Sequence, residues 1–139
     1  MDGQLKAGTF LTSESSNKYK VNTLLGAGGQ GEVYDVECGG KHYALKWYFK
    51  HMATKSQKEI LDNLITRGAP DDSFLWPQDL IFKGYGESFG YIMPLRPKNF
   101  KSIVDMMKRR AEPSFRTLCK AAYNLTNGYQ KLHTMGYSY

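Results

Sequence analysis

The 139-residue sequence is poor in cysteine and has no long apolar run. Cys38 and Cys119 are its only cysteines and lie far apart, so a disulfide framework is not expected. No stretch approaches the roughly 18 apolar residues that span a bilayer. The first residues also lack the basic-then-apolar pattern of a secretory signal. These absences predict a protein that does not enter a membrane and favour the reducing cytoplasm as its location.

The motifs of several enzyme classes are missing as well. The sequence contains no G-x-S-x-G, no H-E-x-x-H and no C-x-x-C. His42, His51 and His133 are scattered, without Cys or Asp at the spacing of metal ligands. We therefore expect no metal site within this chain.

Positive charge is concentrated over residues 96–120. The formal net charge is +6, and eight Lys or Arg lie between Arg96 and Lys120 against only Asp105 and Glu112. Such a stretch is compatible with contacts to a phosphate backbone, or with a solvated helical face. We favour the solvated face and expect no binding to nucleic acid.

The hydrophobic pattern predicts an α+β fold. Three alternating segments, KYKVNTLL, EVYDVEC and KHYALKWY, are typical of strands, and Gly39-Gly40 is a hairpin turn between the last two. DLIFKG and FGYIMPL predict two more strands around a turn at 85–88. We thus expect a five-stranded antiparallel sheet.

Three helices are expected beside this sheet. The first, over 54–68, has apolar residues at helical spacing and ends at Gly68. A short one follows near 101–110, and the clearest begins near Pro113 and runs to about 134. We therefore divide the chain into a flexible lead-in over 1–17, a sheet-bearing lobe over 18–97 and the start of a helical lobe over 98–139.

A glycine-rich turn joins the first two predicted strands. Gly26, Gly28 and Gly31 form G-x-G-x-x-G, with Val33 two positions later. A dinucleotide-binding site would require a helix directly after these glycines, whereas a strand follows here. Between two strands, a loop without Cβ atoms can instead fold over a ligand and present N–H groups to phosphate oxygens.

Lys46 lies inside the third predicted strand, between Leu45 and Trp47. A buried ammonium without an anion is costly, so this Lys requires a partner. A phosphate beneath the glycine loop is one candidate and a carboxylate on the next helix is the other.

With these features, the chain resembles the protein-kinase family over nearly all of its length. GAGGQGEV matches the phosphate-covering loop and YALK matches the family's V-A-I-K strand. The resemblance implies that Lys46 pairs with the phosphates of ATP and with a Glu on the next helix. It also implies that Val33 and Ala44 enclose adenine, with Met93 behind it and the backbone of 94–96 at its edge. The implied ATP-binding residues are Leu25, Gly26, Ala27, Gly28, Gly29, Gln30, Gly31, Val33, Ala44, Lys46, Met93, Pro94, Leu95 and Arg96.

Two residues compete for the helix position that faces Lys46. Glu59 is the only Glu on the helix and is preferred as the second catalytic residue. The family, however, usually has apolar residues three and four positions after this Glu. Gln57 meets that pattern with Ile60 and Leu61, whereas Glu59 is followed at those offsets by polar residues.

The sequence ends with KLHTMGYSY, where the resemblance places the start of the catalytic loop. The Arg and catalytic Asp of H-R-D, the catalytic-loop Asn and the D-F-G Asp that hold Mg²⁺ are not in the sequence. We expect a fragment of a kinase of Ser/Thr type that transfers the ATP γ-phosphoryl to a protein substrate when complete. The alternative is a naturally short kinase-like module that binds nucleotide or a protein partner and catalyses nothing.

The last predicted helix, over 113–134, carries an apolar stripe with spacings of three and four. Its members are Phe115, Leu118, Ala122, Leu125, Tyr129 and Leu132. The stripe should face a helical lobe that is not in this chain. We therefore expect the chain to dimerise through this helix, to exchange it between copies, or to leave it poorly ordered.

Overall fold

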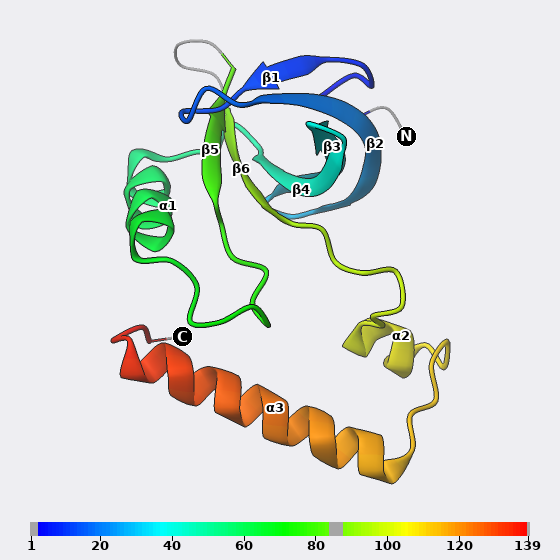
Figure 1. Cartoon of the computed structure of the whole chain (residues 1–139). Helices are drawn as coiled ribbons and strands as arrows, with labels where there is room; N and C mark the ends of the chain where they lie inside the picture. Colours follow the sequence, from blue (N-terminus) through cyan, green and yellow to red (C-terminus); the bar gives the residue numbers. More distant parts are fainter. Residues whose placement is uncertain (1–2, 84–87, 139) are drawn as a thin grey trace. The chain divides into compact units, whose positions relative to one another are not determined.

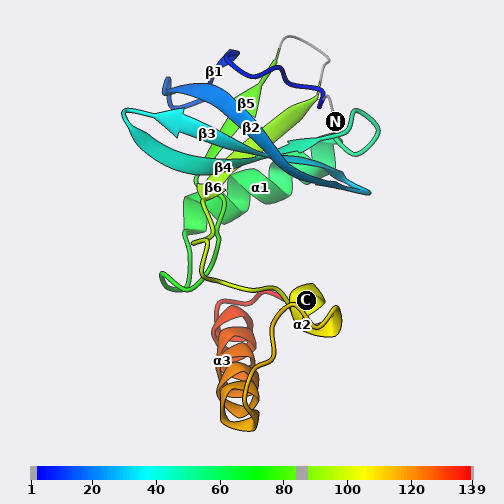
Figure 2. The same ribbon diagram turned by 90° about the vertical axis from the view of Figure 1, so that its right-hand side faces the viewer.

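The computed structural model describes residues 3–83 and 88–138 and divides into two compact units, Met1–Arg96 and Pro97–Tyr139 (Figures 1 and 2). The turn expected at 85–88 falls mostly outside the described residues, and so does Tyr139.

The first unit is built on one antiparallel sheet with the strand order β1-β2-β3-β4-β6-β5. The strands are β1 (Phe10–Thr12), β2 (Lys18–Gly28), β3 (Gly31–Cys38), β4 (Lys41–Tyr48), β5 (Asp79–Phe82) and β6 (Phe89–Pro94). The α+β class and the antiparallel sheet are confirmed, but the expected count of five strands is wrong. The sixth, β1, lies in the segment expected to be a loose lead-in. Three residues are too few to show a period in sequence, yet the burial of Leu5 and Leu11 holds this segment on the sheet.

The sheet curls until its two edges approach each other (Figure 1). An isolated bridge joins Ser13, just after β1, to Ile81 in β5. The Asp79 carboxylate accepts hydrogen bonds from the Ser15 hydroxyl at 3.1 Å and the Asn17 amide at 3.5 Å. The edge strands are thus tied together.

Alternation along the strands sends one set of side chains into the main core. In β3 and β4 the buried set includes Tyr34, Val36, Leu45 and Trp47, and the intervening residues point to the opposite face. The two strands are joined at Gly39-Gly40, where both glycines have positive φ angles, as a type I′ hairpin requires.

Helix α1 (Lys55–Arg67) packs on a second apolar cluster. The Thr54 side chain caps its start by accepting from the Gln57 N–H, and Gly68, with φ 73°, ends it. Leu61 is its buried residue and lies against Tyr48, Leu80 and Phe89. The predicted helix and its glycine stop are confirmed.

The second unit contains α2 (Ile103–Met107) and α3 (Phe115–Thr134). Ser102 and Asp105 form a capping box at the start of α2, and Ser114 caps α3. Large apolar side chains are exposed along α3, among them Phe115, Leu118, Leu125 and Tyr129. No helix in the described part of the chain is long and apolar enough to cross a membrane.

The exposed side chains of α3 lead to a test of self-association. Leu125 is 62% exposed, and burying a Leu side chain contributes roughly 1.5–3 kcal/mol. We expect the wild-type chain to form dimers or larger species at micromolar concentration, and Leu125→Glu to shift it toward monomer. Multi-angle light scattering measures both.

Asn124→Glu is the control, because it adds the same charge at the neighbouring exposed position, away from the apolar stripe. A monomeric wild-type chain, or equal dissociation by both variants, would contradict an association through this stripe.

Candidate functional site

The turn between β2 and β3 forms one wall of a groove of about 500 Å³. The strands pair as far as Gly28 and Gly31, so Gly29 and Gln30 make the turn. The groove is lined by Gly26, Ala27, Gly28, Gly29, Gln30, Gly31, Val33 and Lys46. The structure therefore gathers these sequence-predicted residues around one space.

The glycines of this turn differ in what the fold requires of them. A Cβ on Gly31 would lie 2.1 Å from the Trp47 carbonyl oxygen, so the packing of β3 on β4 demands a glycine there. A Cβ on Gly26, Gly28 or Gly29 would meet no atom within 4 Å, and none of these three has a positive φ. Neither packing nor backbone conformation explains them. Without Cβ atoms, they allow a ligand to approach the backbone of the turn closely.

Lys46 reaches the groove from the middle of β4. Its Nζ donates to the Gln30 Oε1 at 3.0 Å and lies 5.4 Å from the centre of the Tyr48 ring. No carboxylate forms an ion pair with it within the described residues. A phosphate oxygen would be a stronger acceptor for this ammonium than the neutral amide of Gln30.

The structure does not bring Glu59 to Lys46. The Glu59 side chain is 66% exposed and lies 3.8 Å from the Lys55 Nζ. Gln57 instead donates to the Tyr48 hydroxyl at 3.2 Å. The reason is helical geometry, because Gln57 lies four residues before the buried Leu61 and shares its face, whereas Glu59 lies only two before it. Gln57 is thus the residue of the pair that faces the sheet.

The residues expected around adenine continue along the same face of the sheet. The register pairs Val33 with Lys46 and Ala44 with Met93. Directly opposed residues share a face, so all four side chains lie on the side away from the main core. Ala44 is buried and Met93 is partly buried, but neither lines the groove itself.

The remaining residues that were predicted to bind ATP do not line the groove. Pro94 ends β6 opposite Tyr43, Leu95 is partly buried and Arg96 is exposed. Leu25 lies in the register shift between Leu24 and Gly26, is 52% exposed and does not line the groove.

The architecture matches that of a known enzyme fold. No family model matches the sequence, and no curated protein does. Among solved structures, the chain superposes on the structure of vaccinia related kinase 3 with a TM-score of 0.64 and 17% sequence identity. The match covers 94% of this chain and 42% of that one. The fold is that of a protein-kinase amino-terminal lobe.

In this kinase-type lobe, Tyr48 is a site residue that the sequence analysis missed. It lies two positions after Lys46, packs against Phe89 and Tyr91, and accepts from Gln57. Burial raises the pKa of the Tyr48 hydroxyl, and the Gln57 hydrogen bond opposes this rise only in part. The period of two along the strand places Tyr48 on the same face as Lys46, which is the signal that could have revealed it.

The described part of the chain holds no cluster of metal ligands. Within residues 3–83 and 88–138, no three His, Cys, Asp or Glu side chains are grouped closely enough to hold a metal ion. Lys46 is therefore the charged group of the groove, and no carboxylate cluster accompanies it among the described residues.

The contrast between the glycines predicts different effects on stability. Gly31→Ala should lower the free energy of unfolding by about 1–3 kcal/mol, because its Cβ would overlap the Trp47 carbonyl. Gly29→Ala, with open space around it, should change stability by less than about 0.5 kcal/mol. Urea unfolding followed by tryptophan fluorescence measures both. Equal stability of the two variants would show that β3 does not approach β4 as closely as described.

Proposed function

We propose that this chain is the ATP-binding part of a protein kinase of Ser/Thr type. The observation that carries the proposal is the groove in which three glycines without a packing role face the Lys46 ammonium. A glycine turn that lets the backbone approach closely, together with a fixed positive charge, is suited to the phosphates of a nucleotide. In the complete protein, the γ-phosphoryl would pass to a protein hydroxyl.

Within this proposal, each part of the site has a separate task. The Gly26–Gly31 backbone and Lys46 hold the phosphates and offset their charge, which is the main contribution of protein groups to phosphoryl transfer. Val33 and Ala44 contact the adenine face, with Met93 behind the ring. The backbone of 94–96 supplies polar groups at the adenine edge, and Leu25 lies at the exposed margin.

When nucleotide binds, Lys46 would exchange its Gln30 partner for a phosphate. The Lys46 ammonium donates to the neutral side-chain amide of Gln30, which lies at the tip of the turn. A phosphate would replace that amide with a charge-assisted bond, which is roughly twice as strong as a neutral one. Gln57, rather than Glu59, then supports Lys46 indirectly by holding Tyr48 beneath it.

The second candidate function is a kinase-like module that binds without catalysis. Its basis is that these 139 residues contain neither H-R-D nor D-F-G, a feature that part of a kinase would share. In a complete kinase, Mg²⁺ would be held by groups that these 139 residues do not contain. Cys38 and Cys119 are free thiols, which fits a reducing compartment, and we propose the cytoplasm.

Nucleotide binding can be tested at Lys46. Lys46→Met should weaken the affinity for ATP about tenfold or more, because it removes a charged hydrogen-bond donor. Fluorescence titration with an N-methylanthraniloyl derivative of ATP, competed with unlabelled ATP, gives the dissociation constants. Lys50→Met is the matched control, since Lys50 is exposed and lines a different pocket. No binding by the wild-type chain, or equal losses in both variants, would refute the proposal.

Phosphotransfer tests whether this chain alone can catalyse, which neither candidate function expects of it. Because the sequence has no catalytic Asp motif, we expect no transfer of labelled γ-phosphate to casein or to the chain itself. Transfer by the pure chain that is lost in Lys46→Met would show instead that other residues of this chain supply the base.

A further inference from the structure

A segment at the amino terminus crosses the sheet on the side opposite the glycine groove. We call residues 3–12 the strap. Leu5 and Leu11 of the strap are each 4% exposed and belong to the main core. The Gly8 N–H donates to the Val21 carbonyl at 2.7 Å, and the Val21 N–H donates to the Thr9 carbonyl at 2.8 Å. The strap is therefore an integral part of the lobe.

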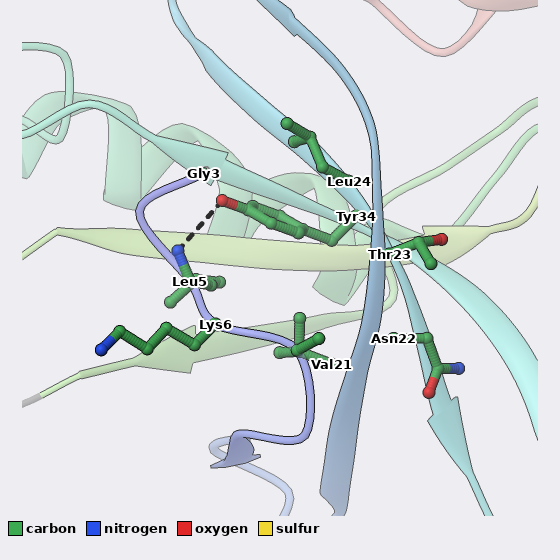
Figure 3. Close-up of a pocket in the computed structure, with 9 residues that line it drawn as sticks. Gly3, Leu5, Lys6, Val21, Asn22, Thr23, Leu24 and Tyr34 are labelled. Atoms are coloured by element: carbon green, nitrogen blue, oxygen red, sulfur yellow. Dashed lines mark hydrogen bonds between the residues drawn. The ribbon is translucent and has the colours of Figure 1, made fainter. Parts of the chain in front are cut away.

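Two side chains of β3, Glu32 and Tyr34, hold the other end of the strap, and Figure 3 shows Tyr34 with its hydrogen bond from Leu5. The buried Tyr34 hydroxyl donates to the Glu32 carboxylate and accepts from the Leu5 N–H at 3.0 Å. The Glu32 Oε2 also accepts from the Gln4 N–H at 2.9 Å. We call this pair of side chains the clasp. Gly3 lies so near that a Cβ there would be 2.2 Å from the Tyr34 hydroxyl oxygen.

The clasp matters because the strap is not packed along its whole length. A groove of about 580 Å³ separates part of the strap from β2, with Leu5, Lys6, Val21 and Leu24 around it (Figure 3). Between the core contact of Leu5 and the backbone bonds at Gly8, the strap has space beneath it. Its first residues are therefore held by the burial of Leu5 together with the hydrogen bonds of the clasp.

The clasp lies at the base of the glycine turn. Glu32 directly follows Gly31, and the register places it between Ala27 of β2 and Trp47 of β4. Strand β2 has register shifts between Val21 and Thr23 and between Leu24 and Gly26. Because β2 is irregular where it enters the turn, the start of β3 is the better fixed side of the hairpin.

We infer that Glu32 and Tyr34 are positioning residues, through which the strap sets the glycine hairpin in the arrangement that binds nucleotide. The inference rests on the proposed ATP binding. Both side chains lie on the face opposite Val33 and Lys46, so neither touches the groove. Loosening the strap widens the motion of the hairpin and lowers the affinity for ATP.

The Tyr34 hydroxyl keeps its proton in this role. Burial and the Glu32 hydrogen bond raise the pKa of Tyr34 to about 12. The hydroxyl thus remains a donor across the pH range of ordinary measurements.

The test uses the full chain with two variants that release the clasp in different ways. Tyr34→Phe removes the hydroxyl, and Gly3→Val pushes the strap off while leaving both clasp side chains intact. Each should speed amide hydrogen exchange over 26–31 in the nucleotide-free protein. Each should also weaken ATP binding roughly threefold to tenfold, as expected for the loss of one or two hydrogen bonds.

Asp79→Asn is the matched control. Asp79 is also buried, and its hydrogen bonds go to Ser15 and Asn17 beyond the strap and to the Leu80 N–H, rather than to β3. It should lower stability without changing exchange over 26–31. Unchanged exchange in both clasp variants, equal increases in all three variants, or faster exchange with unaltered ATP affinity would overturn the inference. If the wild-type chain binds no ATP, the proposed function fails, and the exchange comparison alone decides whether the clasp positions the hairpin.

Discussion

The pairing of β3 with β4 is the constraint on which the rest of the first unit depends. Eight consecutive residue pairs run from Gly31 and Tyr48 to Cys38 and Lys41, and the Gly39-Gly40 turn sets their register. A shift of one residue would exchange the two faces of both strands. The close approach of Gly31 to the Trp47 carbonyl requires this register, because a side chain at that position would not fit.

The register gives each face of the sheet a different task. On one face, Tyr34, Leu45 and Trp47 build the main core and receive the strap. On the other, Val33 and Lys46 lie opposite each other beneath the glycine turn. The core face and the groove face use alternate residues of the same two strands. A change that disturbs the core is therefore transmitted to the groove through the backbone that both faces share.

Lys46 illustrates how a polar group is accommodated in such a strand. The charge is neither fully buried nor matched by a carboxylate in the described structure. Gln30 supplies an acceptor and the Tyr48 ring supplies a π face, so the desolvation cost is partly offset without a second charge. An ammonium left with neutral partners retains its capacity to bind an anion.

The sequence by itself determined several parts of this structure. They are the antiparallel meander, the Gly39-Gly40 hairpin, helix α1 with its Gly68 stop, and the glycine and lysine residues of the groove. Alternation, turn residues and caps act over a few positions, so they can be read without tertiary contacts. The tertiary structure alone decided that β1 joins the sheet, that Gln57 rather than Glu59 faces it, and that Glu32 and Tyr34 hold the strap. Each of these depends on contacts between residues distant in sequence or on the rotation of a helix about its axis. Such contacts are selected by packing, which no short pattern of residues encodes.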